Sequence, residues 1–455
     1  MTLDTADRLE IDPLIDDPGT RIVVCCGAGG VGKTTTAAAL GVRAAERGRK
    51  VVVLTIDPAR RLAQSMGIDS LDNTPRRVPG IARDGGAAGG GELHAMMLDM
   101  KRTFDEIVEA HADPERARAI LENPFYQSLS AGFAGTQEYM AMEKLGQLRA
   151  RDEWDLIIVD TPPSRSALDF LDAPGRLGSF LDGGFIKVLM APAKVGGRAG
   201  MKFLNVGMSM MTGTLGKLLG GQFLRDVQTF VAAMDTMFGG FRTRADATYR
   251  LLQAPGTAFV VVAAPERDAL REAAYFVERL AAEDMPLAGL VLNRVHGSGA
   301  ARLSAERALA AAENLDEGRI VDQRAGKTRG RDAAAVSPEP PVVEHSPETL
   351  HEAPSASPRR GAATVPDASP GEAGRHGSPE AVPPSDIPRL TAGLLRLHAE
   401  RMQVLAREKR TRDRFAALHP EVAVVEVPAL AGDVHDLAGL RAIGQRLAAG
   451  NADAP

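Results

Sequence analysis

The chain has 455 residues but only two cysteines, Cys25 and Cys26, and these are adjacent. Neighbouring residues of a strand point to opposite faces, so the pair provides no disulfide framework and we expect two small core residues. The first residues, MTLDTADRLEIDPLIDD, are acidic and polar, unlike a signal peptide or a basic anchor. A cytoplasmic protein is the simplest interpretation.

An excess of positive charge and long apolar runs are also lacking. The net charge is −5, which argues against nucleic acid as the main partner, because phosphate binding needs clustered Lys and Arg. In the apolar segment 184–223, Lys202, Asn205 and Lys217 interrupt the run, so no transmembrane segment is predicted. The composition, 44% hydrophobic and 25% charged, is that of a soluble globular protein.

What the sequence does contain is a series of short apolar runs that alternate with helical patterns. This alternation predicts an α/β fold, with a doubly wound, mostly parallel sheet and helices on both faces. The gaps on either side of the fourth run exceed a single crossover, so we expect an inserted helical subdomain at about 100–150 and 165–250. The expected strands are residues 21–27, 50–57, 93–99, 155–160, 258–265, 288–294 and 422–428.

The first apolar run leads into GAGGVGKTT, which matches the phosphate-loop pattern G-x-x-x-x-G-K-[ST]. Glycines let successive backbone N–H groups converge on phosphate oxygens, and the following helix N-terminus adds a favourable dipole. The pattern lies between an apolar strand and a helix, which weighs against a glycine-rich turn without a ligand. The residues expected to bind nucleotide here are Gly27, Gly29, Gly30, Val31, Gly32, Lys33, Thr34 and Thr35.

Within this loop, we expect Lys33 to bridge the β- and γ-phosphates of ATP and the Thr34 hydroxyl to bind Mg²⁺. Two further strands end in carboxylates. Asp57 can orient the attacking water, and Asp160 is the expected Mg²⁺-side carboxylate, acting through water. Either aspartate could instead be a helix N-cap. Because both follow apolar strands, Lys33, Asp57 and Asp160 are the expected catalytic residues, with Thr34 and Asp160 at the metal.

Asn293 ends a later strand, in the stretch VLNRVHG. Its amide offers a donor and an acceptor at once, and can therefore read the edge of an adenine base. The alternative is an ordinary turn residue.

One segment lacks what a folded core needs. Residues 320–387 are rich in Pro, Ser and Ala and cannot bury enough apolar surface to offset their ordering entropy, so we expect a disordered insert within the fold. Order resumes with a basic amphipathic helix that leads into the last strand. The expected organisation is an N-terminal tail 1–19, a P-loop core 20–319, the insert 320–387, a helix and strand completing the core over 388–447, and a tail 448–455.

Four stretches together carry a family resemblance: GAGGVGKTT, IDPARRLAQ, DTPPSRSALDFL and VLNR. They resemble the ArsA-like ATPases of arsenite pumps and tail-anchored-protein targeting, P-loop ATPases with a deviant Walker A motif, and most of all the paired actinobacterial "anion-transporting ATPase" subunits. TQEYMAMEKL and VPALAGDVHDLAGLRAIG are similar to the family's acidic helix segment and base-pocket loop. The resemblance covers most of 20–320 and 388–447, and it adds Arg294 and Pro428 to the expected nucleotide site.

The resemblance implies an ATP- and Mg²⁺-dependent dimer whose two nucleotide sites face each other. The family's signature lysine, at the second loop position, reaches across to the partner's phosphates, much as an arginine finger does. This chain has Ala28 there. We therefore expect weak hydrolysis by two identical copies and a heterodimer in which a paralogous subunit lends its lysine. Arg60 or Arg61 is the alternative cation, and pairing with itself is the alternative assembly.

Two family features are missing. Cys25 and Cys26 lie in the expected core strand, so the thiolate site of the metalloid-stimulated members is absent. There is also no CxxC pair for the zinc clasp of the targeting members. Metalloid pumping is therefore not the expected function.

The apolar segment 184–223 is rich in methionine, which suits adaptable apolar surfaces. It either packs against the sheet or a partner subunit, or forms a groove for a hydrophobic client. The expected function is an Mg²⁺-dependent ATPase subunit that couples nucleotide state to a client or membrane-associated partner. The alternatives are a non-catalytic nucleotide-binding regulatory subunit and a ParA/MinD-type positioning ATPase, a class that usually keeps the lysine replaced here by Ala28.

Overall fold

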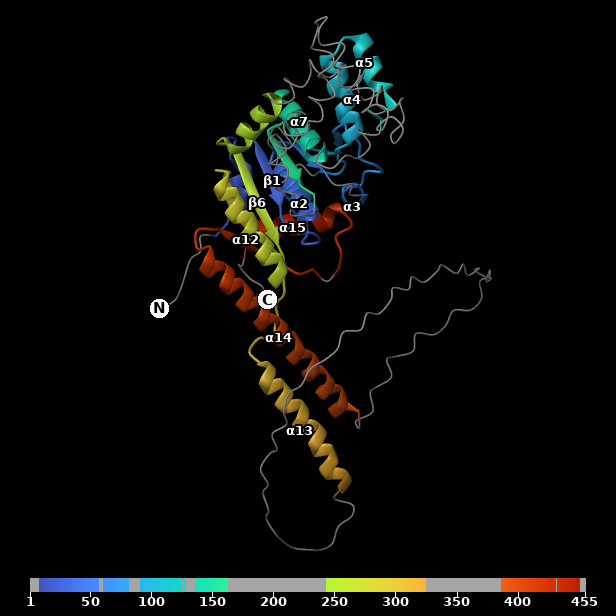
Figure 1. Cartoon of the computed structure of the whole chain (residues 1–455). Coiled ribbons are helices and arrows are strands. Elements are labelled where there is room, and N and C mark those ends of the chain that lie inside the picture. The colour runs from blue at the N-terminus through green and yellow to red at the C-terminus, as the bar shows by residue number, and fades with distance from the viewer. Residues whose placement is uncertain are drawn as a thin grey trace, which may run out of the picture. The chain divides into compact units, whose positions relative to one another are not determined.

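The computed structural model describes residues 8–56, 60–81, 91–124, 126–127, 136–162, 243–324, 386–430 and 432–450. The chain divides into two compact units, residues 1–301 with 404–455, and residues 302–403. The first unit holds an eight-stranded sheet with helices on both faces (Figure 1).

The sheet has the strand order β3-β4-β2-β5-β1-β6-β7-β8, and every neighbouring pair is parallel except β3 and β4. The doubly wound, mostly parallel α/β sheet is therefore confirmed. The edge strand β3 has no apolar signal in its sequence and was not predicted. The strands are β1 Ile22–Cys26, β2 Lys50–Thr55, β3 Arg76–Arg77, β4 Glu92–Met97, β5 Leu156–Asp160, β6 Thr257–Ala263, β7 Leu287–Val295 and β8 Val424–Pro428.

Buried apolar side chains form one cluster on each face of the sheet. One cluster contains residues of α1, α2, α3 and α15, and the other contains residues of α4, α5, α7 and α12. The central strands are buried on both sides, which explains why they appear in the sequence as continuous apolar runs. The helices are α1 Ile11–Asp16, α2 Lys33–Glu46, α3 Arg60–Ser65, α4 Met100–His111, α5 Pro114–Leu121, α7 Thr136–Ala150, α12 Arg267–Ala282 and α15 Leu437–Ala449.

The two cysteines lie in β1 and point to opposite faces of the sheet. Cys25 belongs to the cluster that includes α2, and Cys26 to the cluster that includes α12. Burial raises the pKa of both thiols, that of Cys26 to about 12. They are inert core residues, as their alternation along a strand predicted.

The expected N-terminal tail, residues 1–19, contains a helix in its described part. Helix α1 buries Ile11 and Ile15 among the residues of α2 and α15. On its outer side, Asp12 forms an ion pair with Arg43 of α2. The residues predicted as a tail therefore include a helix that packs against α2 and α15.

Helices α4, α5 and α7 form the first part of the expected helical subdomain, at about 100–150. Most of the second part, 165–250, lies outside the described residues, and so does the methionine-rich segment 184–223. Residues 243–253 are helical, and Arg244 in this helix donates to Glu143 of α7.

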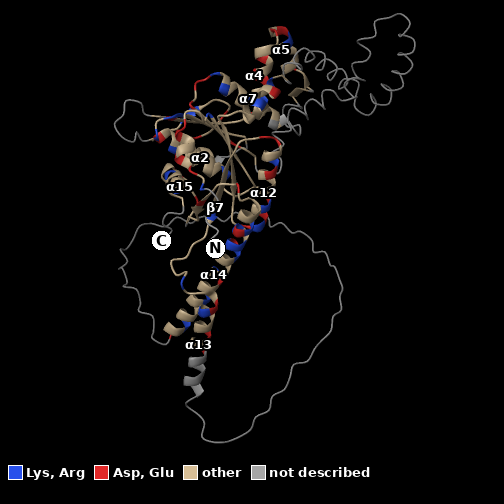
Figure 2. Cartoon of the chain, turned by 90° about the vertical axis from the view of Figure 1, so that its left-hand side faces the viewer, with Lys and Arg blue, Asp and Glu red and all other residues tan. Residues whose placement is uncertain are grey.

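The second unit consists mainly of α13 Ala305–Arg324 and the first half of α14 Ile387–Leu418. An ion pair between Asp316 and Arg396 links the two helices. Helix α13 extends into the expected insert 320–387, and residues 325–385 lie outside the described part. Basic residues occur along α14, as predicted (Figure 2). Among the described helices, none combines the length and apolar character needed to cross a bilayer. The small residues Ala308, Ala312, Ala392 and Ala399 of this unit are buried.

Candidate nucleotide-binding site

The carboxyl end of β1 lies at a switch point of the sheet. β1 is flanked by β5 and β6, and the chain continues from β1 to β2 on one side and from β6 to β7 on the other. In open α/β sheets, ligands bind in the crevice outside such a point, because the flanking loops diverge there. The predicted phosphate loop follows directly after β1.

The glycines of this loop are required by their surroundings. Gly27, Gly30 and Gly32 have φ values of 147°, 76° and 97°, in the region that favours glycine. A Cβ on Gly27 would lie 2.1 Å from the carbonyl oxygen of Val262, and a Cβ on Gly32 would lie 2.2 Å from Nδ2 of Asn293. No other residue fits at either position without a shift of the loop.

The loop leaves an open cradle of backbone at its tip. Gly29 and Gly30 are exposed, and a Cβ on Gly30 would meet no atom within 4 Å. Helix α2 begins at Lys33, and its N-cap, Gly32, has no side chain that could occupy the first turn. Backbone N–H groups and the positive end of the helix dipole therefore adjoin the cradle. These features fit the polyphosphate group of a nucleotide.

The lysine of the motif is held against the loop. Lys33 is 5% exposed, and its Nζ donates to the carbonyl oxygen of Ala28 at 2.7 Å. A buried ammonium is favourable only with strong partners, and a phosphate group would supply the opposite charge. Thr34 and Thr35 follow in the first turn of α2, where their side chains are half-buried.

Asp160 ends β5 beside the loop and is 1% exposed. It lies in register with Cys25 of β1 on one side and Thr55 of β2 on the other. Its Oδ2 accepts a hydrogen bond from the Thr55 hydroxyl at 3.0 Å. Thr55 was not predicted as a site residue, although a polar residue at the end of the apolar run KVVVLT is the kind of signal that marks such a position.

The donor set at Asp160 fits magnesium. In the described part of the chain, no three His, Cys, Asp or Glu side chains gather to hold a metal by themselves. Mg²⁺ needs no such cluster, because it keeps several waters and takes one or two carboxylates together with phosphate oxygens. Asp160 and the Thr34 hydroxyl are the groups predicted for this role, which stays a prediction.

The three residues predicted on the base side lie together at the ends of β7 and β8. Asn293 reaches the phosphate loop, where its Nδ2 donates to the carbonyl oxygen of Val31 at 2.8 Å. Its Oδ1 accepts from the backbone N–H of Arg294 at 3.0 Å. Arg294 is exposed with a φ of 61°, and Pro428 ends β8 in register with Val295. Adenine contact by Asn293 stays a prediction.

The remaining predicted residues are Ala28, Asp57, Arg60 and Arg61. Ala28 is 8% exposed and belongs to the apolar cluster that includes α2. Asp57 lies outside the described residues, and so do the side chains of Arg60 and Arg61. The residue before Asp57, Ile56, is buried.

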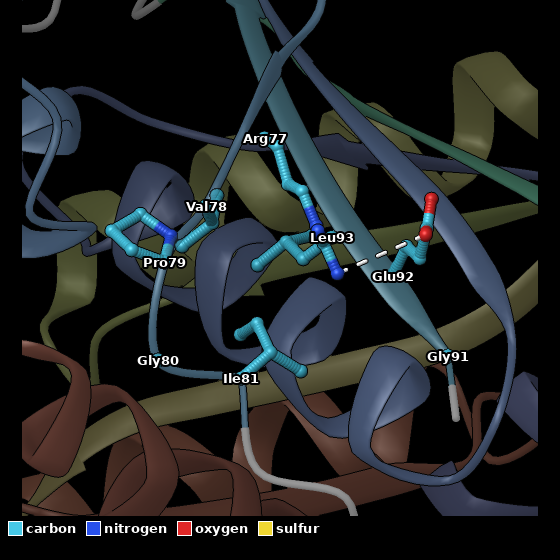
Figure 3. Close-up of a pocket in the computed structure, with 8 residues that line it drawn as sticks. All are labelled: Arg77, Val78, Pro79, Gly80, Ile81, Gly91, Glu92 and Leu93. Atoms are coloured by element: carbon cyan, nitrogen blue, oxygen red, sulfur yellow. Dashed lines mark ion pairs between the residues drawn. The ribbon is translucent and has the colours of Figure 1, made fainter.

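A cavity of about 360 Å³ lies at a different place, where β4 begins beside the edge strand β3 (Figure 3). Arg77 and Glu92 form an ion pair of 3.8 Å at its wall. The cavity therefore lies at the amino end of β4 and is separate from the candidate site, which is at the carboxyl edge of the sheet.

The sequence model of the anion-transporting ATPases matches residues 20–307. ATPase GET3 of Podospora anserina is 25% identical over 64% of this chain and 78% of its own length. ATPase GET3 of Malassezia globosa is 28% identical over 39% of this chain and 49% of its own length, so the chain spans about half of that relative. A putative arsenical pump-driving ATPase of Halobacterium salinarum is 30% identical over 41% of this chain and 28% of its own length. The match to the family covers more than half of the chain and contains the phosphate loop, so the chain belongs to the anion-transporting ATPase family.

Proposed function

We propose that this chain binds ATP at the loop between β1 and α2 and hydrolyses it with Mg²⁺, as one subunit of a dimer. The observation that carries the proposal is the loop itself, in which Gly27 and Gly32, where a Cβ would clash, shape a backbone cradle beside a buried Lys33. Asp160 stands at the end of the neighbouring strand. Membership of an ATPase family supports the same activity.

Each residue then has a defined task. The backbone of 27–32 and the Lys33 amine bind the phosphates. Thr34 and Asp160 hold Mg²⁺, which neutralises phosphate charge when it is bound. Thr55 keeps the Asp160 carboxylate in one orientation by donating to Oδ2. Asp57 orients the attacking water. Catalysis of this kind rests on positioning and charge stabilisation.

On the base side, Asn293 has two roles in this proposal. It braces the loop through Val31, and together with Arg294 and Pro428 it borders the place where a base would lie. The base pocket is thus formed by the ends of β7 and β8, on the side of β1 opposite to Asp160.

The second position of the loop supports an asymmetric dimer. Ala28 carries no charge, so this chain lends no lysine to a partner, and a paralogous subunit lends one to this site. Arg60 or Arg61 in a self-paired dimer is the alternative. In either assembly, which we place in the cytoplasm, the helical subdomain passes the nucleotide state to a hydrophobic client or membrane-associated partner, with segment 184–223 as the contact.

A second candidate is a subunit that binds ATP and activates its partner without hydrolysing ATP itself. The observation that favours it is the same alanine at position 28. The two candidates make different predictions for the isolated chain and for a variant with the lysine restored.

The test is steady-state Mg²⁺-ATP turnover of the purified chain, together with ATP binding by calorimetry. Ala28→Lys and Lys33→Ala are compared with Lys101→Ala, a control on an exposed position of α4. We expect ATP binding with weak turnover in the wild type, a gain in Ala28→Lys, and loss of binding in Lys33→Ala alone. Equal ATP binding by Lys33→Ala and wild type would contradict the proposal. Fast wild-type turnover that Ala28→Lys leaves unchanged would instead favour the self-paired dimer.

A further inference from the structure

The end of β2 is held by hydrogen bonds from two directions. The backbone N–H of Ile56 donates to the carbonyl oxygen of Asp160 at 3.1 Å. The carbonyl oxygen of Ile56 accepts from Nε2 of Gln137 at 3.0 Å. Asp57 follows directly in the chain. The segment that carries the water-orienting carboxylate therefore starts from a residue fixed by the metal-side strand and by a helix.

Gln137 belongs to the layer formed by helices α4, α5 and α7, and not to the sheet. It lies in the first turn of α7, and its half-buried side chain crosses from that helix to the end of β2. The distance is normal for an amide N–H that donates to a carbonyl oxygen. A side chain from the helical layer thus contacts the backbone next to Asp57.

Helix α7 is itself fixed by two part-buried ion pairs, in each of which the residue of α7 is the buried member. Glu143 is 5% exposed and accepts from Arg244 at 2.8 Å. Lys144 is 4% exposed, and its Nζ lies 2.9 Å from Glu106 of α4. Breaking a buried pair leaves an uncompensated charge, so α7 is tied to both neighbouring helices. A displacement of this layer moves Gln137 with it.

We propose that Gln137 is a positioning residue for Ile56 at the end of β2, and that it makes hydrolysis depend on where the layer of α4, α5 and α7 sits on the sheet. The inference rests on the proposed ATPase function and names the contact that regulates it. When the layer is seated, the Gln137 amide holds Ile56 and fixes the start of the segment. When the layer is displaced, the hydrogen bond breaks and Ile56, the residue before Asp57, loses this support. A partner that moves the layer thereby changes turnover without contacting the nucleotide.

Two substitutions of Gln137 remove its hydrogen bond to Ile56 in different ways. Asparagine keeps the amide but is one methylene shorter, so it cannot reach Ile56 from the same backbone position. Glutamate keeps the length, but its ionised carboxylate accepts only and repels the carbonyl oxygen. A protonated glutamate donates again. Gln147 on the same helix provides a matched control, because it lies at a small cavity beside Asn73 and not at β2.

The experiment measures kcat and KM for Mg²⁺-ATP, and ATP affinity by calorimetry, on the full chain with Gln137→Asn, Gln137→Glu and Gln147→Ala. We expect both Gln137 variants to lower kcat by about three- to tenfold, the effect of one lost hydrogen bond. KM and ATP affinity stay unchanged. The kcat ratio of Gln137→Glu to wild type rises as the pH falls from about 8 to about 6, because burial and the carbonyl oxygen favour the protonated acid. Gln147→Ala matches the wild type.

Unchanged kcat in both Gln137 variants would overturn the proposal, and so would an equal loss in Gln147→Ala. If the wild type itself does not hydrolyse ATP, the proposed function fails and the contact is judged by amide hydrogen exchange. In that case the backbone of residues 57–62 exchanges faster in both Gln137 variants than in the wild type and Gln147→Ala. Equal exchange in all four proteins would show that Gln137 does not position this segment.

Discussion

The two ends of the sheet are built in opposite ways. At the amino end, the side chain of Arg49 is 9% exposed and fills the space with hydrogen bonds to the backbone. At the carboxyl end, the turn after β1 is glycine backbone with an exposed tip at Gly29 and Gly30. The amino end uses its hydrogen-bond donors within the fold, whereas we propose that the exposed backbone at the carboxyl end donates to the phosphates of a nucleotide. The guanidinium of Arg49 donates to the backbone carbonyl oxygens of Ile15, Asp17, Thr20 and Asp155.

The comparison separates residues that hold the fold from residues that serve the reaction. Arg49 joins α1 to the segments that precede β1, β2 and β5, so it fixes three strand entrances at once. Burial lowers the pKa of its guanidinium, yet an arginine keeps its charge in proteins. The Thr55 and Asp160 pair joins β2 to β5 at the opposite end, where one hydrogen bond orients a carboxylate.

The largest expected effect comes from Arg49→Met. It leaves four backbone carbonyl oxygens without this donor, so we expect the free energy of unfolding to fall by about 2–4 kcal/mol. ATP affinity of the folded protein stays unchanged. Urea unfolding followed by the fluorescence of Trp154, the single tryptophan, measures the change. Arg271→Met, at an exposed position of α12, is the control. A fall in the free energy of unfolding of less than about 0.5 kcal/mol, the usual size for surface substitutions, would show that Arg49 does not hold the amino end of the sheet.

A smaller effect, on activity and not on stability, is expected from Thr55→Val. The variant keeps the shape of the side chain and removes the hydroxyl that donates to Asp160. We expect turnover to fall by about three- to tenfold and the Mg²⁺ concentration at half-maximal rate to rise, because the carboxylate loses one orienting bond. The urea midpoint moves far less than for Arg49→Met. Thr55→Ser keeps the hydroxyl and should retain activity; a loss of activity in both variants would point to packing instead.

At the carboxyl end, the sequence predicted the strands and the loop better than the contacts that support them. The apolar runs, the loop and Asp160 are local patterns, and the structure has them where the patterns predicted. The contacts of Thr55 with Asp160 and of Gln137 with Ile56 join segments that are far apart in the chain. They depend on β2 lying beside β5 and on α7 lying over the end of β2, which no local pattern encodes. Edge strand β3 was missed because its two residues, Arg76 and Arg77, give no apolar signal, and helix α1 was missed because it has only six residues and contains a proline.

The smallest expected effect concerns pH at the amino end. His94 of β4 packs edge-on against Trp154, with ring centroids 4.9 Å apart, and burial lowers the pKa of its imidazole. The unfolded chain therefore binds this proton more readily than the folded chain does. The resulting stability is complete above the unfolded pKa of about 6.5 and is lost as the pH falls below it.

Unfolding free energies between about pH 5 and pH 8 measure this contribution. His94→Gln should flatten the slope on the acid side, and His435→Gln, at an exposed position, should not. The same slope in His94→Gln as in the wild type would assign the pH dependence to other groups.

The burial of both thiols in β1 has a practical consequence for following the nucleotide cycle. Cys25 and Cys26 are 0% and 1% exposed, so neither competes for a thiol-directed dye in the folded chain. A single cysteine introduced on the exposed side of α4 would be the reactive thiol among the residues described here. The protein can therefore carry a site-specific fluorophore on helix α4 while both native cysteines are kept.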